Sequence, residues 1–232
     1  MNKKLLEGIE ILKVETDDMK LQKLDKYFKE LIEYNEHTNL TAIRDENDLI
    51  EKHFLDSLIV HKNLPISKGN AIDIGTGAGF PGMVLAIMNP EIQMTLMDSV
   101  GKKTKFLEMI KEKLELPNVE VVNGRSEDYI EGRREMYDLG LCRGVNRLNV
   151  ILEYVTPFIK VNGIFFPQKL EYIDEVEEAE NALKTLNCQL IEVINESLPF
   201  SKDARTILKI KKISKTDEKF PRKAGKALKK PL

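Results

Sequence analysis

Apolar positions in the first part of the chain recur with helical spacing. One face is formed by Leu21, Leu24, Phe28, Leu31 and Ile32. This spacing predicts a helix over residues 21–35. Asp48 followed by Glu51 resembles a capping box, which predicts a second helix beginning near Asn47 or Asp48. The polar residues 38–45 between the two helices predict a loop.

The pattern changes after Pro65, where short apolar runs alternate with helical ones. The short runs predict strands at residues 71–74, 93–97, 119–122, 138–142 and 164–166. The helical runs fall at residues 82–88, 102–114, 148–159 and 173–186. This alternation predicts an α/β fold with a parallel sheet covered on both faces. Two further runs, at residues 188–195 and 206–211, predict a terminal hairpin, and the residues after Ser214 look like a surface segment.

The length of 232 residues suits one α/β domain with an extension. We expect a helical extension over residues 1–66, a core over 67–214 and a basic tail over 215–232 that packs on or near the core. The chain shows neither a signal-peptide pattern nor an apolar run approaching the roughly 18 residues of a membrane span. We therefore expect a cytoplasmic monomer. Cys142 and Cys188 lack metal-ligand spacing, so we expect free thiols and no metal.

Charge is distributed unevenly although the formal net charge is only −2. Acidic residues outnumber basic ones over the first sixty or so positions. From Lys219 to the end the charged residues are all basic: Lys219, Arg222, Lys223, Lys226, Lys229 and Lys230. Without acidic neighbours in the sequence, these side chains favour a local contact with a polyanion such as RNA.

Residues 71–82, Ala-Ile-Asp-Ile-Gly-Thr-Gly-Ala-Gly-Phe-Pro-Gly, lead from a predicted strand through alternating glycines into a helix. Such a loop in a parallel sheet lies where ligands bind. The last three glycines also match the dinucleotide pattern G-x-G-x-x-G, so NAD stays an alternative. Two features favour S-adenosylmethionine, a cation without phosphates: Pro81 lies inside the loop, and Asp73 can hold either the loop or the amino-acid end of the ligand.

Asp98 ends the next predicted strand. A carboxylate at this position can accept hydrogen bonds from both ribose hydroxyls of a nucleoside. Either cofactor carries that ribose, so Asp98 supports a nucleoside ligand without choosing between the two.

The glycine loop and the segment Met97-Asp98-Ser99-Val100-Gly101-Lys102-Lys103 together resemble the bacterial small-subunit ribosomal RNA guanine-N7 methyltransferases, the glucose-inhibited division protein B family. The resemblance includes Asn39-Leu40-Thr41-Ala42-Ile43-Arg44 and His53-Phe54-Leu55-Asp56-Ser57-Leu58 upstream. It ends with Phe220-Pro221-Arg222-Lys223-Ala224-Gly225 and Lys229-Lys230-Pro231-Leu232. It therefore covers most of the chain after about residue 20.

The resemblance implies a class I methyltransferase fold, Rossmann-like, with a mostly parallel seven-stranded sheet behind the helical extension. It implies S-adenosylmethionine as methyl donor and 16S ribosomal RNA or the small ribosomal subunit as partner. The residues expected to bind the cofactor are Asp73, Gly75, Gly77, Gly79, Phe80, Asp98, Ser126, Glu127 and Arg143. The residues expected to bind RNA are Arg44, His53, Arg125, Lys169, Arg222, Lys223, Lys229 and Lys230. The tail should leave cofactor affinity almost unchanged, because sheet loops build the donor site.

Two stretches depart from the family pattern. Gly144-Val145-Asn146-Arg147 stands where small residues are usual, and Pro167-Gln168-Lys169-Leu170 stands in place of Leu-Lys-Gly. Lys169 keeps a lysine, but the glycine of the loop is missing. Arg143 is either the floor of the active site or a structural partner of Glu127 or Asp138.

Guanine N7 already carries a lone pair, so its methylation requires no general base and none is assigned. Alignment of the reacting atoms would supply most of the catalysis. Two other functions remain open from the sequence: an NAD-dependent oxidoreductase, and a noncatalytic RNA-binding factor for ribosome assembly. The sequence leaves open the target nucleotide and whether the substrate is free RNA or an assembled subunit.

Overall fold

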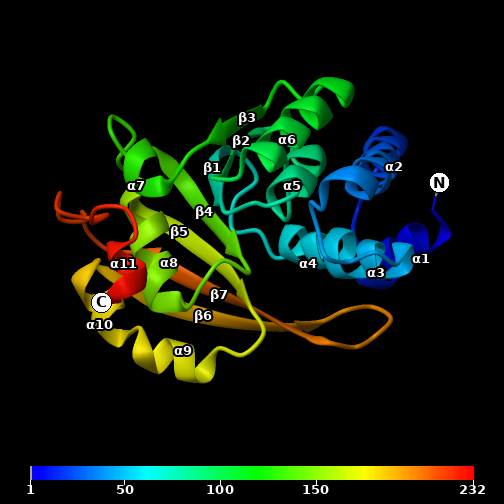
Figure 1. The fold of residues 1–232 in the computed structure, drawn as a ribbon. Helices are drawn as coiled ribbons and strands as arrows, with labels where there is room; N and C mark the ends of the chain where they lie inside the picture. The colour runs from blue at the N-terminus through cyan, green and yellow to red at the C-terminus, as the bar shows by residue number, and fades with distance from the viewer. Residues whose placement is uncertain (1) are drawn as a thin grey trace.

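The computed structural model describes residues 2–232, and within them seven strands form one sheet of order β3-β2-β1-β4-β5-β7-β6 (Figure 1). The strands are β1 (Gly69–Ile74), β2 (Ile92–Asp98), β3 (Val119–Asn123), β4 (Tyr137–Arg143), β5 (Ile159–Lys169), β6 (Cys188–Ser197) and β7 (Ala204–Lys212). Strands β1 to β5 are parallel, whereas β7 runs antiparallel to both β5 and β6. The predicted α/β fold class and terminal hairpin are confirmed.

Helices cover both faces of the sheet. They are α5 (Gly82–Met88), α6 (Gly101–Lys113), α7 (Ser126–Tyr129), α8 (Leu148–Val155), α9 (Ile173–Glu178), α10 (Glu180–Thr185), α11 (Lys226–Lys229) and the 3-10 turn η2 (Thr156–Phe158). Alternate strand residues serve opposite faces. Ala71 packs with α5 and α6 in one hydrophobic cluster, and Ile72 packs with α8 and α10 in the other.

A layer of N-terminal helices lies beyond α5 and α6 (Figure 1). It contains α1 (Lys3–Leu12), α2 (Asp18–Thr38), α3 (Glu46–Leu49), the π-helix η1 (Ile50–Leu55) and α4 (Asp56–Lys62). Helix α1 was not predicted; the Asn2 side chain caps it by accepting from the Leu5 amide. The capping box at Asp48 was wrong, because Asp45 is the N-cap and accepts from the Asp48 amide at 2.9 Å.

Two predicted helices are shorter than expected. The helix predicted over residues 148–159 ends at Val155 and passes into the 3-10 turn η2, because Pro157 has no amide hydrogen to donate to the carbonyl four residues before it. The helix predicted over residues 173–186 is divided at Ala179 into α9 and α10, and nothing in the local sequence explains the break.

Most of residues 215–232 are exposed, as expected for a surface segment, but a few of their side chains are buried. Phe220 and Ala227 are only 3% and 2% exposed, and Phe220 belongs to the cluster beneath α8. The apolar side chains of this segment therefore anchor it to the domain although its composition is basic.

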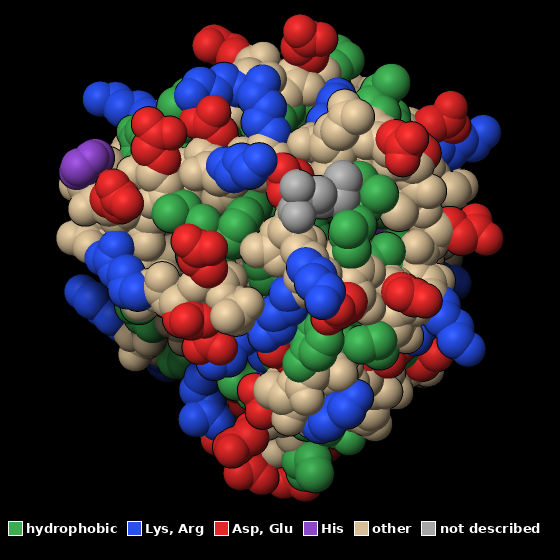
Figure 2. All heavy atoms as spheres, turned by 90° about the vertical axis from the view of Figure 1, so that its right-hand side faces the viewer, with side chains coloured by type: hydrophobic (Ala, Val, Ile, Leu, Met, Phe, Trp, Pro, Cys, Tyr) green, Lys and Arg blue, Asp and Glu red, His purple; other side chains and the backbone are tan. Residues whose placement is uncertain are grey.

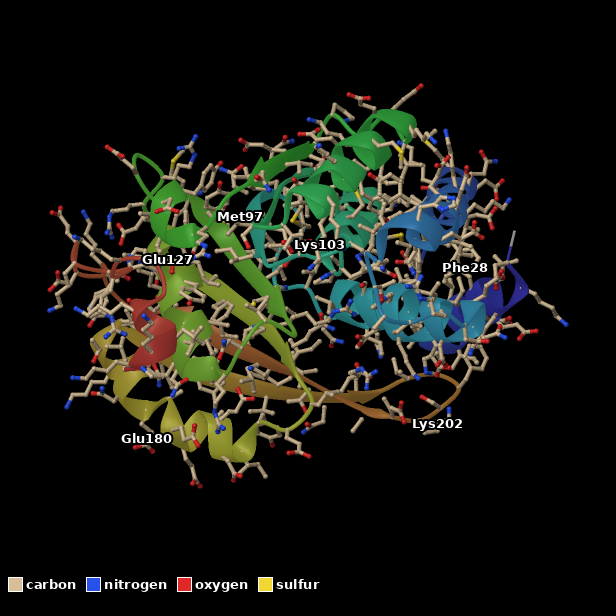
Figure 3. The ribbon with its side chains drawn as sticks, viewed as in Figure 1. Phe28, Met97, Lys103, Glu127, Glu180 and Lys202 are labelled. Atoms are coloured by element: carbon tan, nitrogen blue, oxygen red, sulfur yellow. The ribbon has the colours of Figure 1, made fainter. Side chains whose placement is uncertain are left out.

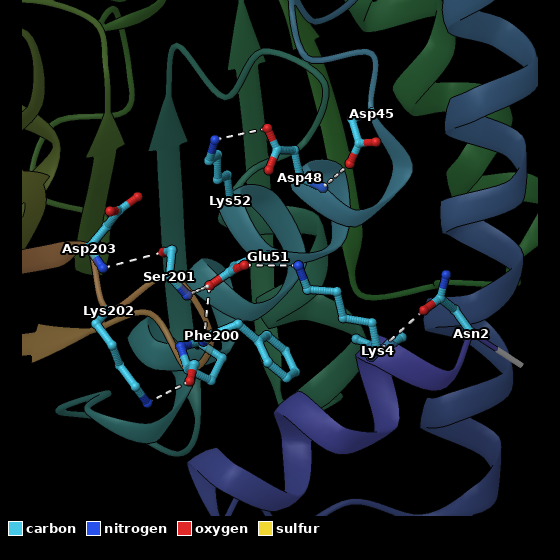
Figure 4. A network of polar contacts seen from close by, with 12 residues as sticks. Asn2, Lys4, Asp45, Asp48, Glu51, Lys52, Phe200, Ser201, Lys202 and Asp203 are labelled. Carbon is cyan, nitrogen blue, oxygen red and sulfur yellow. Dashed lines mark hydrogen bonds and ion pairs between the residues drawn. The ribbon is translucent and has the colours of Figure 1, made fainter.

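Glu51 of η1 joins the N-terminal layer to the tip of the β6–β7 hairpin (Figure 4). Its Oε1 accepts from the amides of Phe200 and Ser201 at 3.0 and 2.6 Å, and its Oε2 accepts from Lys4 Nζ at 2.9 Å. Burial opposes ionisation of Glu51, but the hydrogen bonds from Ser201, Lys4 and Phe200 outweigh it and lower the pKa. Figure 2 shows charges of both signs interspersed over the helical face of the molecule.

We predict that Glu51→Gln lowers the free energy of unfolding at neutral pH by about 1.5–3 kcal/mol, the range for a hydrogen bond to a charged group. A depressed carboxyl pKa stabilises the fold above the unfolded-state pKa and loses that effect as pH falls through the folded-state pKa. The difference between wild type and variant should therefore shrink below about pH 4. Urea titrations across pH test this, with exposed Glu10→Gln as control; an equal difference at all pH values would contradict it.

Candidate active site

The glycine loop between β1 and α5 is tied together by the buried carboxylate of Asp73. Its Oδ2 accepts from Thr76 Oγ1 at 2.7 Å near the start of the loop and from the Gly82 amide at 2.9 Å at its end. Burial raises the pKa of Asp73. Of the two roles considered for Asp73, the structure places it in the one that holds the loop.

Gly75 opens the loop with a φ of +75°, a left-handed conformation that residues with a Cβ rarely adopt. A Cβ at Gly75 would overlap the side chain of Val145. The loop following β4 therefore approaches the loop following β1 closely, at the point where the strand order of the sheet reverses.

Asp98, the last residue of β2, lies beside the loop with 6% of its surface exposed. Its Oδ2 accepts from the Gly77 amide and its Oδ1 from the Val100 amide, both at 2.9 Å. Lys103 Nζ lies 3.6 Å from Oδ2. A carboxylate has about four acceptor positions, so Asp98 retains capacity for hydroxyl donors of a ligand.

A cavity of about 430 Å³, the loop cavity, opens at the carboxyl ends of β1, β2, β3 and β4. Its lining includes Gly75, Asp98, Ser126, Glu127, Gly144 and Val145. Met97, Lys103 and Glu127 reach it from β2, α6 and α7 (Figure 3). The volume falls within the range of small-molecule and cofactor sites, roughly 300–1,000 Å³.

A second cavity of about 890 Å³, the cationic cavity, shares Gly144 and Val145 with the loop cavity. Its cationic residues are Lys52, Arg143, Arg147, Lys169 and Arg205, and its acidic residues are Asp56, Glu171 and Glu175. The excess of positive charge at its wall suits a polyanionic ligand.

Arg143, at the end of β4, is held by the N-terminal helices. Its Nη1 donates to Asp56 Oδ2 at 2.8 Å and to the Lys52 carbonyl at 3.1 Å. Arg205 Nε donates to the other oxygen of Asp56 at 3.0 Å. The structural partner of Arg143 is thus Asp56, so the alternative of a pairing with Glu127 or Asp138 was wrong.

His53 is fixed in one tautomer by its neighbours. Arg143 Nη2, which can only donate, lies 3.0 Å from His53 Nδ1, so Nδ1 accepts and the proton is on Nε2. Nε2 lies 2.9 Å from Thr41 Oγ1 and donates to it. Burial and then the charge of Arg143 lower the pKa of His53 to about 3. The neutral ring stacks on Phe80 with centroids 4.6 Å apart.

The residues predicted to bind the cofactor fall into three groups. Four line the loop cavity: Gly75, Asp98, Ser126 and Glu127. Four build or hold the loop: Gly77, Gly79 and Phe80 belong to it, and Asp73 of β1 ties it together. Arg143 lies in the cationic cavity instead. A direct contact between each of them and the cofactor stays a prediction.

The residues predicted to bind RNA are dispersed. His53 and Lys169 line the cationic cavity, and exposed Arg125 lies at the rim of the loop cavity. Arg44 holds its own loop by donating to the carbonyl of Asn35 and to the side chain of Asn39. Lys223, Lys229 and Lys230 are exposed. The expectation that the tail cations lack acidic partners was wrong for Lys219, which pairs with Asp217, and for Arg222, which pairs with Glu153.

The departures from the family pattern occupy the walls of both cavities. Strand β5 continues through Pro167 and Gln168 and ends at Lys169, and the glycine that the family has after this lysine is absent. Gln168 Nε2 lies 3.4 Å from Asp56 Oδ1, and Lys169 Nζ lies 2.6 Å from both Glu175 Oε2 and the Asn146 carbonyl. In place of a small residue, Val145 supplies part of the wall between the cavities.

Sequence reasoning missed Asp56, Arg205, Tyr154 and Leu228. The signal for Asp56 was available, because an acidic residue between Leu55 and Leu58 of an apolar helix indicates a buried, paired charge. Arg205, Tyr154 and Leu228 carry no local signal and reach the cavities through the tertiary fold.

Over the part of the chain that the structure describes, no cluster of His, Cys, Asp or Glu could hold a metal ion. Among the helices of residues 2–232, none is long and apolar enough to cross a membrane.

A mostly parallel seven-stranded sheet with a glycine loop after β1 and an acidic residue ending β2 defines an α/β fold with a nucleoside site, and solved S-adenosylmethionine-dependent methyltransferases share this fold. Solved structures with this fold include a SAM dependent methyltransferase from Aquifex aeolicus, with a TM-score of 0.54, 18% identity and coverage of 70% of this chain and 92% of that one. Another is M. jannaschii TYW2 in complex with AdoMet, with a TM-score of 0.55, 14% identity and coverage of 68% and 77%.

The profile of the GidB family, described as rRNA small subunit methyltransferase G, matches residues 20–208, and the chain belongs to this family. The protein named Ribosomal RNA small subunit methyltransferase G from Fusobacterium nucleatum is 56% identical over 226 residues, covering 97% of each chain. The cofactor is S-adenosylmethionine, so the alternative of an NAD-dependent oxidoreductase is wrong.

We predict that Gly75→Ala weakens S-adenosylmethionine binding about tenfold or more, since a side chain at positive φ is strained and its Cβ would push Val145 into the ligand space. Isothermal titration calorimetry measures this affinity. Gly101→Ala, at the start of α6 with ordinary φ and open surroundings, is the matched control. Wild-type affinity in Gly75→Ala would refute the assignment of the loop cavity to the donor.

Proposed function

We propose that this methyltransferase transfers the methyl group of S-adenosylmethionine to N7 of a guanine in 16S ribosomal RNA. The observation that carries the proposal is the pair of adjoining cavities, which share Gly144 and Val145. The loop cavity would hold the donor and the cationic cavity the RNA. The shared wall is where the methyl group would pass from one ligand to the other.

The loop cavity suits the donor in chemistry as well as size. Asp98 can accept the ribose hydroxyls with the acceptor positions that Gly77 and Val100 leave free. Gly75 allows close approach of the ligand to the backbone. Ser126 and Glu127 would flank the purine, as they follow β3 on the far side of Asp98 from the glycine loop.

The cationic cavity suits a nucleotide of structured RNA. Arg147 is half exposed and pairs with Glu178, and Lys52 is more than one third exposed and pairs with Asp48. Exposed pairs of this kind are weak, so both cations can exchange their carboxylates for phosphate oxygens. A guanine base would have to leave its stack to present N7 to the shared wall. Arg143 can donate to guanine O6 or stack on the base, and it must leave N7 free.

The chain's own residues act by orientation and not by moving a proton. When bound, the donor would supply an electrophilic methyl carbon to guanine N7 as its carbon–sulfur bond breaks, leaving S-adenosylhomocysteine and a positively charged 7-methylguanine. His53 serves as a neutral support for Phe80, since both of its ring nitrogens are engaged. Alignment across the shared wall can contribute up to about 7–11 kcal/mol to lowering the barrier.

The named relatives and the two cavities bear on the RNA substrate and on the oligomeric state that we propose. The Fusobacterium nucleatum relative is named for small-subunit ribosomal RNA, which supports that RNA as substrate here. Both cavities are built by one chain, which supports a monomer. The proposal places the enzyme in the cytoplasm and divides it into a helical extension (1–66), a catalytic core (67–214) and a C-terminal tail (215–232).

Incubation with small-subunit ribosomal RNA and donor should yield one 7-methylguanosine, mapped by strand scission at the modified base and by mass spectrometry. RNA binding without methyl incorporation would instead support a noncatalytic assembly factor. Methylation at another atom would refute the assignment of N7.

Asp98→Ala should weaken the binding of the donor and of its demethylated product alike, by about 1.5–3 kcal/mol, since both carry the ribose.

The methyl-transfer rate at saturating substrates should change little from about pH 6 to about pH 8, because no general base is required. His53, with its pKa lowered to about 3, stays neutral throughout this range. Single-turnover rates across the range measure this. A rise in rate following a single ionisation near neutral pH would contradict a base-free mechanism.

A further inference from the structure

The last residues of the chain, 220–232, form a segment that we call the C-terminal strap. It lies along α8 and ends in the short helix α11, close to α7 (Figure 1). Phe220 and Ala227 are buried, and Arg134 Nη2 donates to the carbonyls of Glu218 and Phe220. The strap is therefore anchored at its beginning and again at α11.

A buried ion pair fixes the middle of the strap. Glu153 of α8 is fully buried, and Arg222 meets both of its oxygens, with Nε at 2.9 and 3.0 Å and Nη2 at 2.6 Å. The Arg222 amide donates to the same carboxylate at 2.7 Å. A buried carboxylate deprived of its partner strongly destabilises a fold. Glu153 of α8 therefore needs Arg222 as its partner, and this ion pair holds the strap firmly on the domain.

From this anchor the strap reaches the loop cavity. The Gly225 amide donates to Glu127 Oε1 at 3.2 Å, and Gly225 and Leu228 line the cavity beside Tyr154. Leu228 is 55% exposed, whereas Phe220 and Ala227 of the same segment are buried. An exposed leucine at the wall of a ligand cavity gains apolar burial when a ligand covers it.

We propose that the C-terminal strap is part of the donor site and that Leu228 packs against the purine of the donor. This inference rests on the proposed function. With the methionine end near Gly75 and the ribose at Asp98, the connectivity of the donor places its purine beyond Asp98, on the side of Ser126, Glu127 and the strap. This proposal replaces the expectation that the tail leaves cofactor affinity almost unchanged.

Calorimetric titration with S-adenosylhomocysteine and with methylthioadenosine, which lacks the amino-acid end, tests this proposal. Leu228→Ala should weaken both ligands by a similar factor of about five to ten, since each loses the same apolar contact with the purine. A chain lacking residues 226–232, which keeps the Arg222–Glu153 ion pair, should lose at least as much affinity. Leu6→Ala, an exposed leucine on α1 away from both cavities, is the control and should bind like wild type.

The outcomes distinguish a failure of the strap proposal from a failure of the proposed function. If wild type binds neither ligand, the proposed function fails. If wild type binds both, and Leu228→Ala and the shortened chain bind them equally well, the strap proposal is overturned while the function stands. A loss confined to S-adenosylhomocysteine would also overturn it, because the contact would then lie at the amino-acid end.

Discussion

The architecture of the site depends on one buried carboxylate, that of Asp56. It lies on α4 in the N-terminal layer, 4% exposed, and accepts from Arg143 of β4 and Arg205 of β7. Isolated in the interior, such a charge would be strongly unfavourable, so its partners are constrained to stay. Arg143 in turn fixes the tautomer of His53, which stacks on Phe80 of the glycine loop. Through these contacts the carboxylate of Asp56 fixes the N-terminal layer, strands β4 and β7, and the glycine loop relative to one another.

The N-terminal and C-terminal segments each contribute residues to one of the two cavities. The parallel sheet supplies the glycine loop and Asp98, and its fold is shared with solved methyltransferases of 14% and 18% identity. The N-terminal layer contributes Lys52, His53 and Asp56 to the cationic cavity, whereas the C-terminal strap contributes Gly225 and Leu228 to the loop cavity. Each extension is held by a buried carboxylate paired with arginine, Asp56 in one case and Glu153 in the other.

The two cavities differ in the balance of their charges. The loop cavity holds two carboxylates, Asp98 and Glu127, and two cations, Lys103 and Arg125, whereas the cationic cavity has an excess of Lys and Arg where a phosphate backbone would bind. Neutral His53 adds no charge to the boundary between them. Many of the cations are held by backbone carbonyls or carboxylates, which positions them before RNA arrives and reduces the ordering cost of binding.

The sequence by itself determined the strands, the glycine loop and the family, because these depend on local periodicity and on residues close together in the chain. Alternation of apolar runs predicted all the strands of the sheet, and Asp73, Gly75 and Asp98 could be identified from their positions at strand ends.

Which charged side chains are free to bind a ligand could be seen only in the tertiary structure. Arg222 in a basic tail looked like a free phosphate ligand, yet Glu153, which pairs with it, lies 69 residues away in sequence. The family resemblance assigned Arg143 to the donor, yet Asp56 turns it toward the other cavity. Ion pairs of this kind bring together residues that no periodicity links, since a buried charge requires a partner in space and not a neighbour in sequence.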